Sequence, residues 1–534
     1  MNSRPYNHIK LAIVICLSII SFGCSSSSDT STATTSVSGV VLAGPASGSS
    51  VSVKNAAGTV VAGPVTTAAD GSYTIAVQTS FLTSDLIFEA SGGNFPDEAT
   101  ATTGVVLATL TAHASAGSLT SGSNVTIDPS STIVQKLVAG GKTRAAAETI
   151  FAAAFGYTPD CSIKPAFATI SSVSTTSQRL IGLRAAAFSQ LTKDLGLTPA
   201  KQFELIQALA DDLSDGVMDG LKTGGTAVTT ASGTAIPADL DNAFAKALMT
   251  FQASSLNKSK LTTDKIDAPP FAQKALTASY IVEYVPGMIA ATQGKTSFKI
   301  KLSNRNDGSA ATGKAITLMP TMYMPSMTHS APVDAVVESS TPGTYDCSVY
   351  YLMASGPGMG IWELKVMIGM ETATFYPPVA MAMGTTNRAA LKGVNDVIGS
   401  MMGMGTSKRT YYLFNDSSTF GMSSTFKLFI AAADDSMMMK FPAVSAGSTL
   451  HNEMNVARTV ASMTVEASTD NGSTWNSLTS AATGHWSVSG LTGLAAGGTV
   501  KVRVVIDGEQ KTTDGTAAVA GTNDFATFTV VAEM

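Results

Sequence analysis

The chain has 534 residues, of which 13% are charged, and its formal net charge is −5. This length predicts several domains, each able to bury its own core. The lack of a basic surplus excludes a nucleic-acid partner, and the apolar content of 44% excludes a largely disordered chain.

The N-terminus has the pattern of a secretory signal. Arg4 and Lys10 precede an apolar run from Leu11 to Phe22, which is short for a membrane span but suits the core of a signal peptide. No later run reaches the roughly 18 apolar residues of a spanning helix. We therefore expect residues 1–23 to be a signal peptide that is removed.

The apolar run ends at Cys24, which is followed by four serines. This ending resembles a bacterial lipobox, although Ser21 and Phe22 depart from the commoner residues there. The resemblance implies that Cys24 carries the lipid, including palmitate, that 24–36 form a flexible Ser/Thr linker, and that Ser25 favours the outer membrane. The anchored chain then faces the periplasm or the cell surface. The alternative is an ordinary secretory signal, which leaves Cys24 as a free thiol.

Two further cysteines remain in the mature chain. In an oxidising compartment Cys161 and Cys347 either pair as a disulfide or stay as buried thiols. No C-x-x-C-H motif is present, so a covalently bound c-type haem is excluded.

Residues 37–127 alternate between apolar and polar side chains with turn residues between the runs, which predicts strands. The segments Gly39-Val40-Val41 and Val51-Ser52-Val53, with Asp70, Gly71 and Tyr73 in D-G-S-Y, resemble the carboxypeptidase-regulatory-like β-sandwich. The resemblance implies a small prealbumin-like spacer or binding module rather than an enzyme.

Residues 128–275 change to apolar spacings of three and four, which predicts a helical domain of four or five helices. Thr198 and Pro199 mark one helix start, as N-cap and first helical residue. Gly140 to Thr143 read G-G-K-T, but Lys136 stands where a phosphate-binding loop needs its first glycine. No nucleotide is therefore expected.

Residues 276–380 return to strand-like alternation. Three motifs stand in order here: Met324-Pro325-Ser326-Met327 with His329, then Pro342-Gly343-Thr344-Tyr345, then Gly360 with Trp362, Leu364 and Val366. They resemble the YtkA-like or FixH-like domains of bacterial envelope proteins. The resemblance implies an immunoglobulin-like sandwich, and several such relatives work in copper handling and cytochrome oxidase assembly.

The last part of the chain has two predicted segments. Residues 381–408 are rich in Met and Gly and form a linker, with a short helix expected over 387–398. Residues 409–534 form a C-terminal immunoglobulin-like sandwich, with Asn471-Gly472 at a hairpin turn. The fold class is thus multidomain and mainly β, with immunoglobulin-like and prealbumin-like sandwiches and an inserted α-helical bundle.

Methionine is unevenly distributed, because 20 of the 24 lie between Met288 and Met463. Thioether sulfur with a nearby histidine suits Cu(I) far better than a hard cation. The candidate ligands are Met322, Met324, Met327 and His329, and further candidates are Met319, Met359, His451 and Met454. Because successive strand residues alternate between faces, one straight strand cannot supply all four ligands, so we expect a turn at Pro325 to bring Met324, Met327 and His329 together.

The methionines also suit two roles that involve no metal. They fill irregular sandwich cores, as we expect for Met319, Met353 and Met367 on strand-like alternation, or they form an adaptable surface for a protein partner. His113 is expected to be solvated and His485 to be structural. No catalytic motif is present, so the alternative to copper binding is a non-enzymatic scaffold or adhesion lipoprotein.

Overall fold

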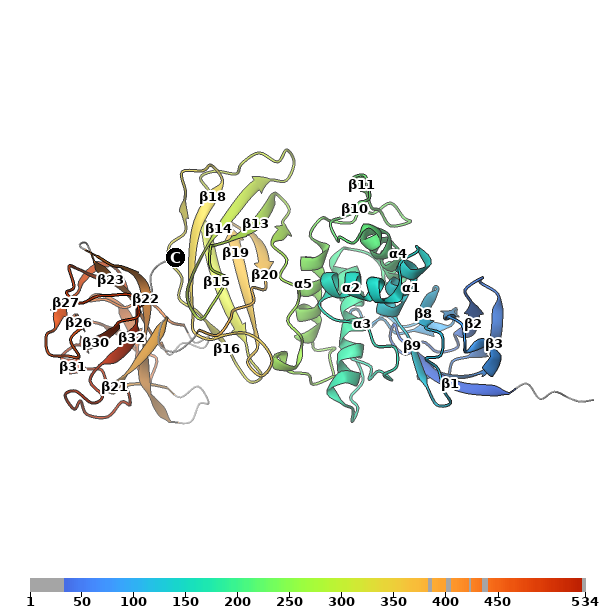
Figure 1. Ribbon diagram of the computed structural model, residues 1–534, viewed down its shortest axis with the longest axis horizontal. Coiled ribbons are helices and arrows are strands. Elements are labelled where there is room, and N and C mark those ends of the chain that lie inside the picture. Colours follow the sequence, from blue (N-terminus) through green and yellow to red (C-terminus); the bar gives the residue numbers. More distant parts are fainter. Residues whose placement is uncertain (1–32, 383–386, 400–404, 422–423, 435–439, 531–534) are drawn as a thin grey trace, which may run out of the picture.

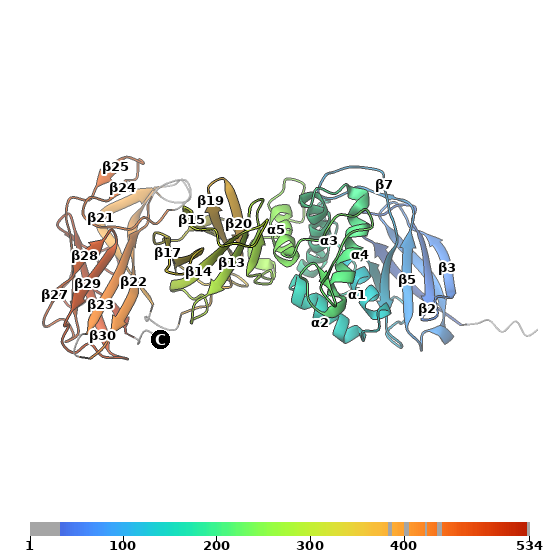
Figure 2. The ribbon, with the colours of Figure 1, turned by 90° about the horizontal axis from the view of Figure 1, so that it is seen from above.

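The computed structural model describes residues 33–382, 387–399, 405–421, 424–434 and 440–530. The chain is mainly β, and the predicted fold class is confirmed. Figures 1 and 2 show four parts side by side along the long axis: a first sandwich, a helical layer, a middle sandwich and a C-terminal sandwich. The predicted signal peptide and the predicted lipidation site Cys24 lie outside the described residues.

The first sandwich packs two sheets face to face. One sheet has the order β4-β1-β9, with β1 and β9 parallel, and the other has the order β3-β2-β5-β8. The strands of this part are β1 (Thr34–Val41), β2 (Ser50–Asn55), β3 (Val60–Thr66), β4 (Ser72–Gln78), β5 (Leu86–Ser91), β6 (Asn94–Phe95), β7 (Val105–Val106), β8 (Leu110–Ala114) and β9 (Asn124–Ile127). Alternate residues of β4 point inward, and the Tyr73 hydroxyl donates to the Val125 carbonyl at 2.7 Å.

The helical layer follows directly. Its helices are α1 (Pro129–Ala139), α2 (Arg144–Phe155), α3 (Thr176–Asp194), α4 (Gln202–Asp212) and α5 (Leu240–Gln252), with the short strands β10 (Leu221–Lys222) and β11 (Thr226–Ala227) before α5. Asp128 caps α1 by accepting from the Ser131 amide, and Gly156 ends α2 in the left-handed conformation. The predicted start at Thr198 is a single 3-10 turn, Pro199–Lys201, without a side-chain cap, and α4 begins after it.

The first sandwich and the helices share one hydrophobic core. It runs from Val37 through the ring cluster of Phe155, Phe188 and Phe244 to Phe251 without a break. Each helix is apolar on the face toward the sheets, so neither layer buries its apolar surface alone. We call the first sandwich and the helical layer the first unit, because they share this core. Within the part of the chain that the structure describes, no helix is long and apolar enough to cross a membrane.

The middle sandwich is built from a sheet of order β12-β13-β14-β18-β17 and a sheet of order β16-β15-β19-β20. The strands are β12 (Lys274–Leu276), β13 (Tyr280–Pro286), β14 (Gly294–Asn304), β15 (Ile316–Tyr323), β16 (Thr328–Ser330), β17 (Val337–Glu338), β18 (Thr344–Tyr351), β19 (Ile361–Ile368) and β20 (Glu371–Phe375). Trp362 is fully buried between the sheets. The Asn242 amide of α5 donates to the Thr374 carbonyl at 2.9 Å, which fixes this sandwich to the helical layer.

The C-terminal sandwich begins earlier than predicted. Residues 388–399 form β21 rather than a helix or linker, because they pair with β22 over two stretches of regular register. Ala, Leu and Lys favour a helix locally, but pairing with a neighbouring strand outweighs that preference. The strands are β21 (Arg388–Gly399), β22 (Thr406–Thr419), β23 (Thr425–Ala432), β24 (Thr449–His451), β25 (Ala457–Thr459), β26 (Met463–Ser468), β27 (Asn476–Ser477), β28 (Thr479–Ala482), β29 (His485–Ser489), β30 (Thr499–Ile506), β31 (Glu509–Gln510) and β32 (Ala526–Thr529).

Candidate soft-metal site

The methionine-rich segment folds back on itself. β15 and β16 form an antiparallel hairpin in which Met322 stands opposite His329, and the Met324 amide donates to the Met327 carbonyl at 2.9 Å across a turn at Pro325. Residues opposite each other in such a ladder project from the same face. The hairpin therefore places Met322 and His329 on one face, although a straight strand would separate them. The turn brings the backbones of Met324 and Met327 together beside that pair.

These side chains differ in depth. Met322 is fully buried in the sandwich core, and His329 is 5% exposed. Met324 is half-buried against the same core, as is Met359. Met319 has the opposite parity on β15 and is 43% exposed, so it lies away from this face. The structure places Met322 and His329 on one face and Met319 on the other.

The Nε2 atom of His329 faces Met353, a methionine that the sequence pattern assigned to core packing. The Nε2 atom of His329 lies 3.3 Å from the sulfur of Met353, and the Nδ1 atom lies 2.8 Å from the Ser330 carbonyl oxygen. The Trp362 indole donates to the Met353 carbonyl at 2.9 Å, which holds that residue in place. In the sequence, Met353 is marked only by its place in Leu352-Met353-Ala354, directly after β18. That pattern does not distinguish a metal ligand from a core residue.

The proton arrangement at this pair is incomplete. A carbonyl oxygen only accepts, so Nδ1 of His329 carries the hydrogen that binds Ser330, and in the neutral ring Nε2 then carries a lone pair. The thioether of Met353 has no hydrogen to donate. Burial lowers the pKa of His329 below its usual range; the hydrogen bond to Ser330 acts in the opposite direction, and the charge of Arg388 adds to the lowering. Two lone-pair atoms therefore face each other with no proton between them.

Two aromatic rings pack against the ring of His329. Its ring meets Trp362 edge to face with centroids 5.3 Å apart, and it meets Phe441 of the C-terminal sandwich edge to face with centroids 5.9 Å apart. Arg388, also from the C-terminal sandwich, donates through Nη1 to the Leu352 carbonyl, one residue before Met353. The site thus lies at the junction of two sandwiches and is lined by apolar groups.

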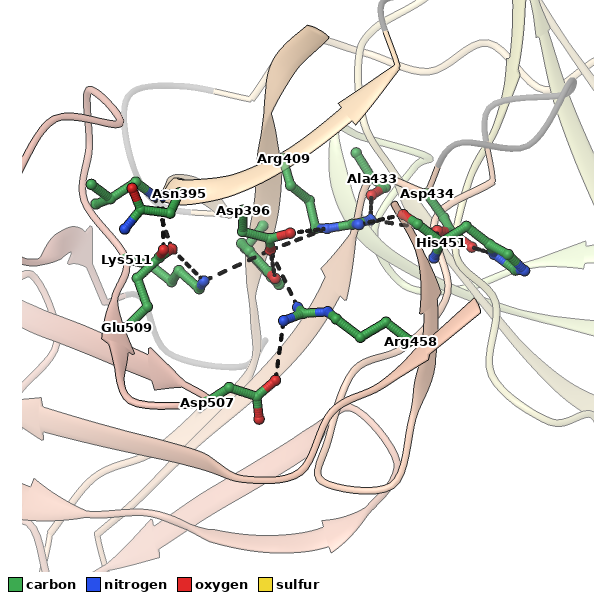
Figure 3. Close-up of polar contacts among 12 residues, drawn as sticks. Asn395, Asp396, Arg409, Ala433, Asp434, His451, Arg458, Asp507, Glu509 and Lys511 are labelled. Carbon is green, nitrogen blue, oxygen red and sulfur yellow. Dashed lines mark hydrogen bonds and ion pairs between the residues drawn. The ribbon is translucent and has the colours of Figure 1, made fainter. Parts of the chain in front are cut away.

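His451 and Met454 lie elsewhere, on the β24–β25 hairpin. The Nδ1 atom of His451 is 2.8 Å from Asp434, and Met454 is 71% exposed. Figure 3 shows that Asp434 also pairs with Arg409, which extends to Asp396 as part of a buried charge network. Among the described residues, no hydrogen bond or ion pair joins His451 or Met454 to His329.

A second polar group joins the two sandwiches. His485 of β29 contacts Asp334 at 3.0 Å through Nε2 and Asp416 at 3.3 Å through Nδ1, and Lys295 of β14 pairs with Asp416 at 2.6 Å. Hydrogen bonds to the two aspartates raise the pKa of His485 to about 9. We call Lys295, Asp334, Asp416 and His485 the junction cluster. His485 is structural here, whereas His113, expected to be solvated, is 7% exposed.

The cysteines do not pair. Cys161 and Cys347 are both free, one in the helical part and the other in the core of the middle sandwich, and burial raises the pKa of each thiol to about 12. Among the described residues, no group of three or more His, Cys, Asp or Glu side chains is arranged to hold a metal ion. A metal site here depends on thioether ligands.

Comparison with known proteins adds little. No family model and no curated protein matches the chain. Two solved titin structures show weak likeness: a chimeric Z1Z2 functionalized with a KLER exogenous peptide from decorin (9% identity, 49% of this chain, 98% of that chain, TM-score 0.11) and the Z1Z2 domains in complex with telethonin (9%, 49%, 97%, 0.12). At these TM-scores the likeness carries no argument about function.

Proposed function

We propose that the protein is a lipid-anchored envelope protein that binds copper as Cu(I) in its middle sandwich, for storage, delivery or resistance. The observation that carries the proposal is the contact between Nε2 of His329 and the sulfur of Met353 at 3.3 Å. The hydrogen bond from Nδ1 to the Ser330 carbonyl assigns the ring hydrogen to Nδ1 and leaves Nε2 of the neutral ring with a lone pair. A soft cation satisfies both atoms at once, and bonds of about 2.0 Å to nitrogen and 2.3 Å to sulfur fit a separation of this size.

The donor set supports a soft, low-charge ion. His329 and Met353 are neutral, and Met322 extends the set from the opposite position of the hairpin. Met324 and Met327 follow at the turn, where a copper ion is passed inward from solvent. This revises the predicted ligands: Met353 joins the site, and Met319, His451 and Met454 leave it.

The hydrogen bond from His329 to Ser330 strengthens the ligand role of the histidine. Metal-binding histidines commonly donate their other ring hydrogen to a carbonyl or carboxylate, which fixes the tautomer and the ring orientation. The Ser330 carbonyl does this for His329 at 2.8 Å. Trp362 holds the Met353 backbone in the same way. Both ligands are thus held before any ion arrives.

The rest of the chain positions this module. Lipid on Cys24 tethers the mature chain to the outer membrane, and the first sandwich, with its likeness to carboxypeptidase-regulatory-like modules, serves as a spacer. The likeness of the middle sandwich to YtkA-like modules agrees with copper as the ion. An envelope protein that gives or receives copper is the expected partner.

The test is titration of the full-length chain with Cu(I) under a competing chelator. H329A and M353L are each expected to weaken the affinity at least about tenfold, since each removes one of few ligands. The matched control is M370L, because Met370 is fully exposed and lies away from the site. Equal affinity in all four proteins rejects the copper proposal.

A second candidate is a scaffold that binds a partner protein through exposed methionines. Met288, Met370, Met381 and Met454 are each more than half exposed, outside the copper site. Such side chains adapt to varied partners. Replacing all four by Gln is expected to abolish partner capture and leave Cu(I) affinity unchanged. Retained capture by that variant rejects the scaffold.

A further inference from the structure

The C-terminal sandwich places one positive charge, that of Arg388, beside the candidate copper site. Arg388 on β21 reaches across the junction, and its Nη1 donates to the Leu352 carbonyl, next to Met353 in sequence. The guanidinium also lies over the Tyr412 ring, 5.3 Å from its centroid. Two separate contacts therefore hold this cation beside the site.

No carboxylate binds either of the two proposed ligands, within the described residues, to balance the charge of Arg388. Within the described part of the chain, neither His329 nor Met353 has a hydrogen bond or ion pair with a carboxylate. The carboxylates of the junction cluster are paired with Lys295 and His485 instead. An ion placed between His329 and Met353 thus meets neutral ligands and one nearby positive charge.

We propose that Arg388 determines the charge specificity of this site, by opposing divalent cations and leaving the His329–Met353 pair to a soft monovalent cation. Coulomb repulsion is proportional to the charge of the bound ion, so the repulsion is twice as large for a divalent ion as for a monovalent ion at the same position. Low local dielectric strengthens the effect, and His329 is 5% exposed. This inference rests on the proposed function, because it names which class of cation the site accepts.

The experiment compares two variants in the full-length chain. R388Q removes the charge and keeps a donor for the Leu352 carbonyl, whereas R388K keeps the charge. Ag(I), an air-stable soft monovalent ion, and Zn(II) are the probes. R388Q is expected to raise the Zn(II) affinity by the square of the factor by which it raises the Ag(I) affinity, and R388K to change neither affinity.

Equal factors for Ag(I) and Zn(II) in R388Q, or a change of either affinity in R388K, overturn the inference. Failure of the proposed function appears separately, as Ag(I) affinity that H329A does not lower.

Discussion

Tyr350 of the middle sandwich stacks on Phe429 of the C-terminal sandwich, with ring centroids 4.0 Å apart and planes 12° apart. Both rings are buried in a small core at the junction, together with Phe414 and Phe441. The Tyr350 hydroxyl also donates to Asp334 and Asp416. The two sandwiches therefore share an apolar contact with a polar rim, and the position of Phe441 and Arg388 beside His329 depends on it.

Truncation of Tyr350 tests that contact. Y350A is expected to cost about 3–5 kcal/mol of junction stability, because a buried ring is removed. Y350F, which loses only the hydroxyl bonds, is expected to cost about 1–2 kcal/mol. Denaturant unfolding of Y350A should resolve the C-terminal sandwich as a separate, earlier transition. A single transition at the wild-type midpoint contradicts the role given to this ring.

The junction cluster makes docking depend on pH. Burial raises the pKa of Asp416, but contacts with His485 and Lys295 lower it more, so it stays well below its ordinary value. The pKa of His485 is raised to about 9. Stability from the charged histidine is fully present below about pH 6.5 and is lost as the pH rises through about 9. The comparison of wild type with H485Q should show a difference of about 1–2 kcal/mol at pH 7, after solvent screening, that shrinks by pH 10. A difference that stays constant over this range shows that His485 is not charged in the folded protein.

The buried charge network in Figure 3 is expected to stabilise the C-terminal sandwich strongly. Arg409 is 1% exposed and binds Asp396 through Nε at 3.1 Å to both oxygens, while Lys511, also 1% exposed, lies 3.7 Å from the same carboxylate. D396N leaves Arg409 without its nearest anion, while Lys511 keeps Glu509 at 2.7 Å. The loss of the Arg409 partner should cost about 3–5 kcal/mol in thermal or chemical unfolding.

The control for that variant is R503Q. Arg503 pairs with Glu466 at 2.6 Å on the half-exposed surface of β30, and such pairs contribute about 0–1 kcal/mol. Similar losses in D396N and R503Q mean that the network adds no more than surface pairs do.

Glu98 makes the first unit less stable as the pH rises. It is 2% exposed, one of its carboxyl oxygens has no partner, and burial, with the charge of Asp97, raises its pKa to about 8. Between about pH 4.5 and 8 the unfolded chain releases a proton that the folded chain keeps, so stability falls over this range. E98Q should remove the fall and be more stable than wild type near pH 8. Parallel pH profiles of the two proteins contradict a raised pKa.

Local pattern predicted the strands and helices well where periodicity was regular. Alternation in β14 and β19 and the three-four spacing in α3 each correspond to an element with its apolar residues inward. It failed at residues 388–399, where the strand exists because β22 lies beside it. Pairing with a distant strand cannot be predicted from the spacing of apolar residues within one segment.

The sequence predicted only part of the candidate site. Met322 to His329 form one local motif, and their common face follows from one turn. Met353 is 24 residues from His329 and reaches it through the packing of the two sheets. Phe441 and Arg388 come from a different sandwich, so their contact depends on how the two parts dock. Sequence spacing carries no information about that docking.

The most direct test of the central claim is X-ray absorption spectroscopy of the full-length chain loaded with one equivalent of Cu(I). We predict a coordination sphere that contains one nitrogen at about 2.0 Å and sulfur at about 2.3 Å, with the nitrogen lost in H329A and the sulfur reduced in M353L. A coordination sphere that keeps its nitrogen in H329A, or that has no sulfur, contradicts the assignment of copper to the His329–Met353 pair.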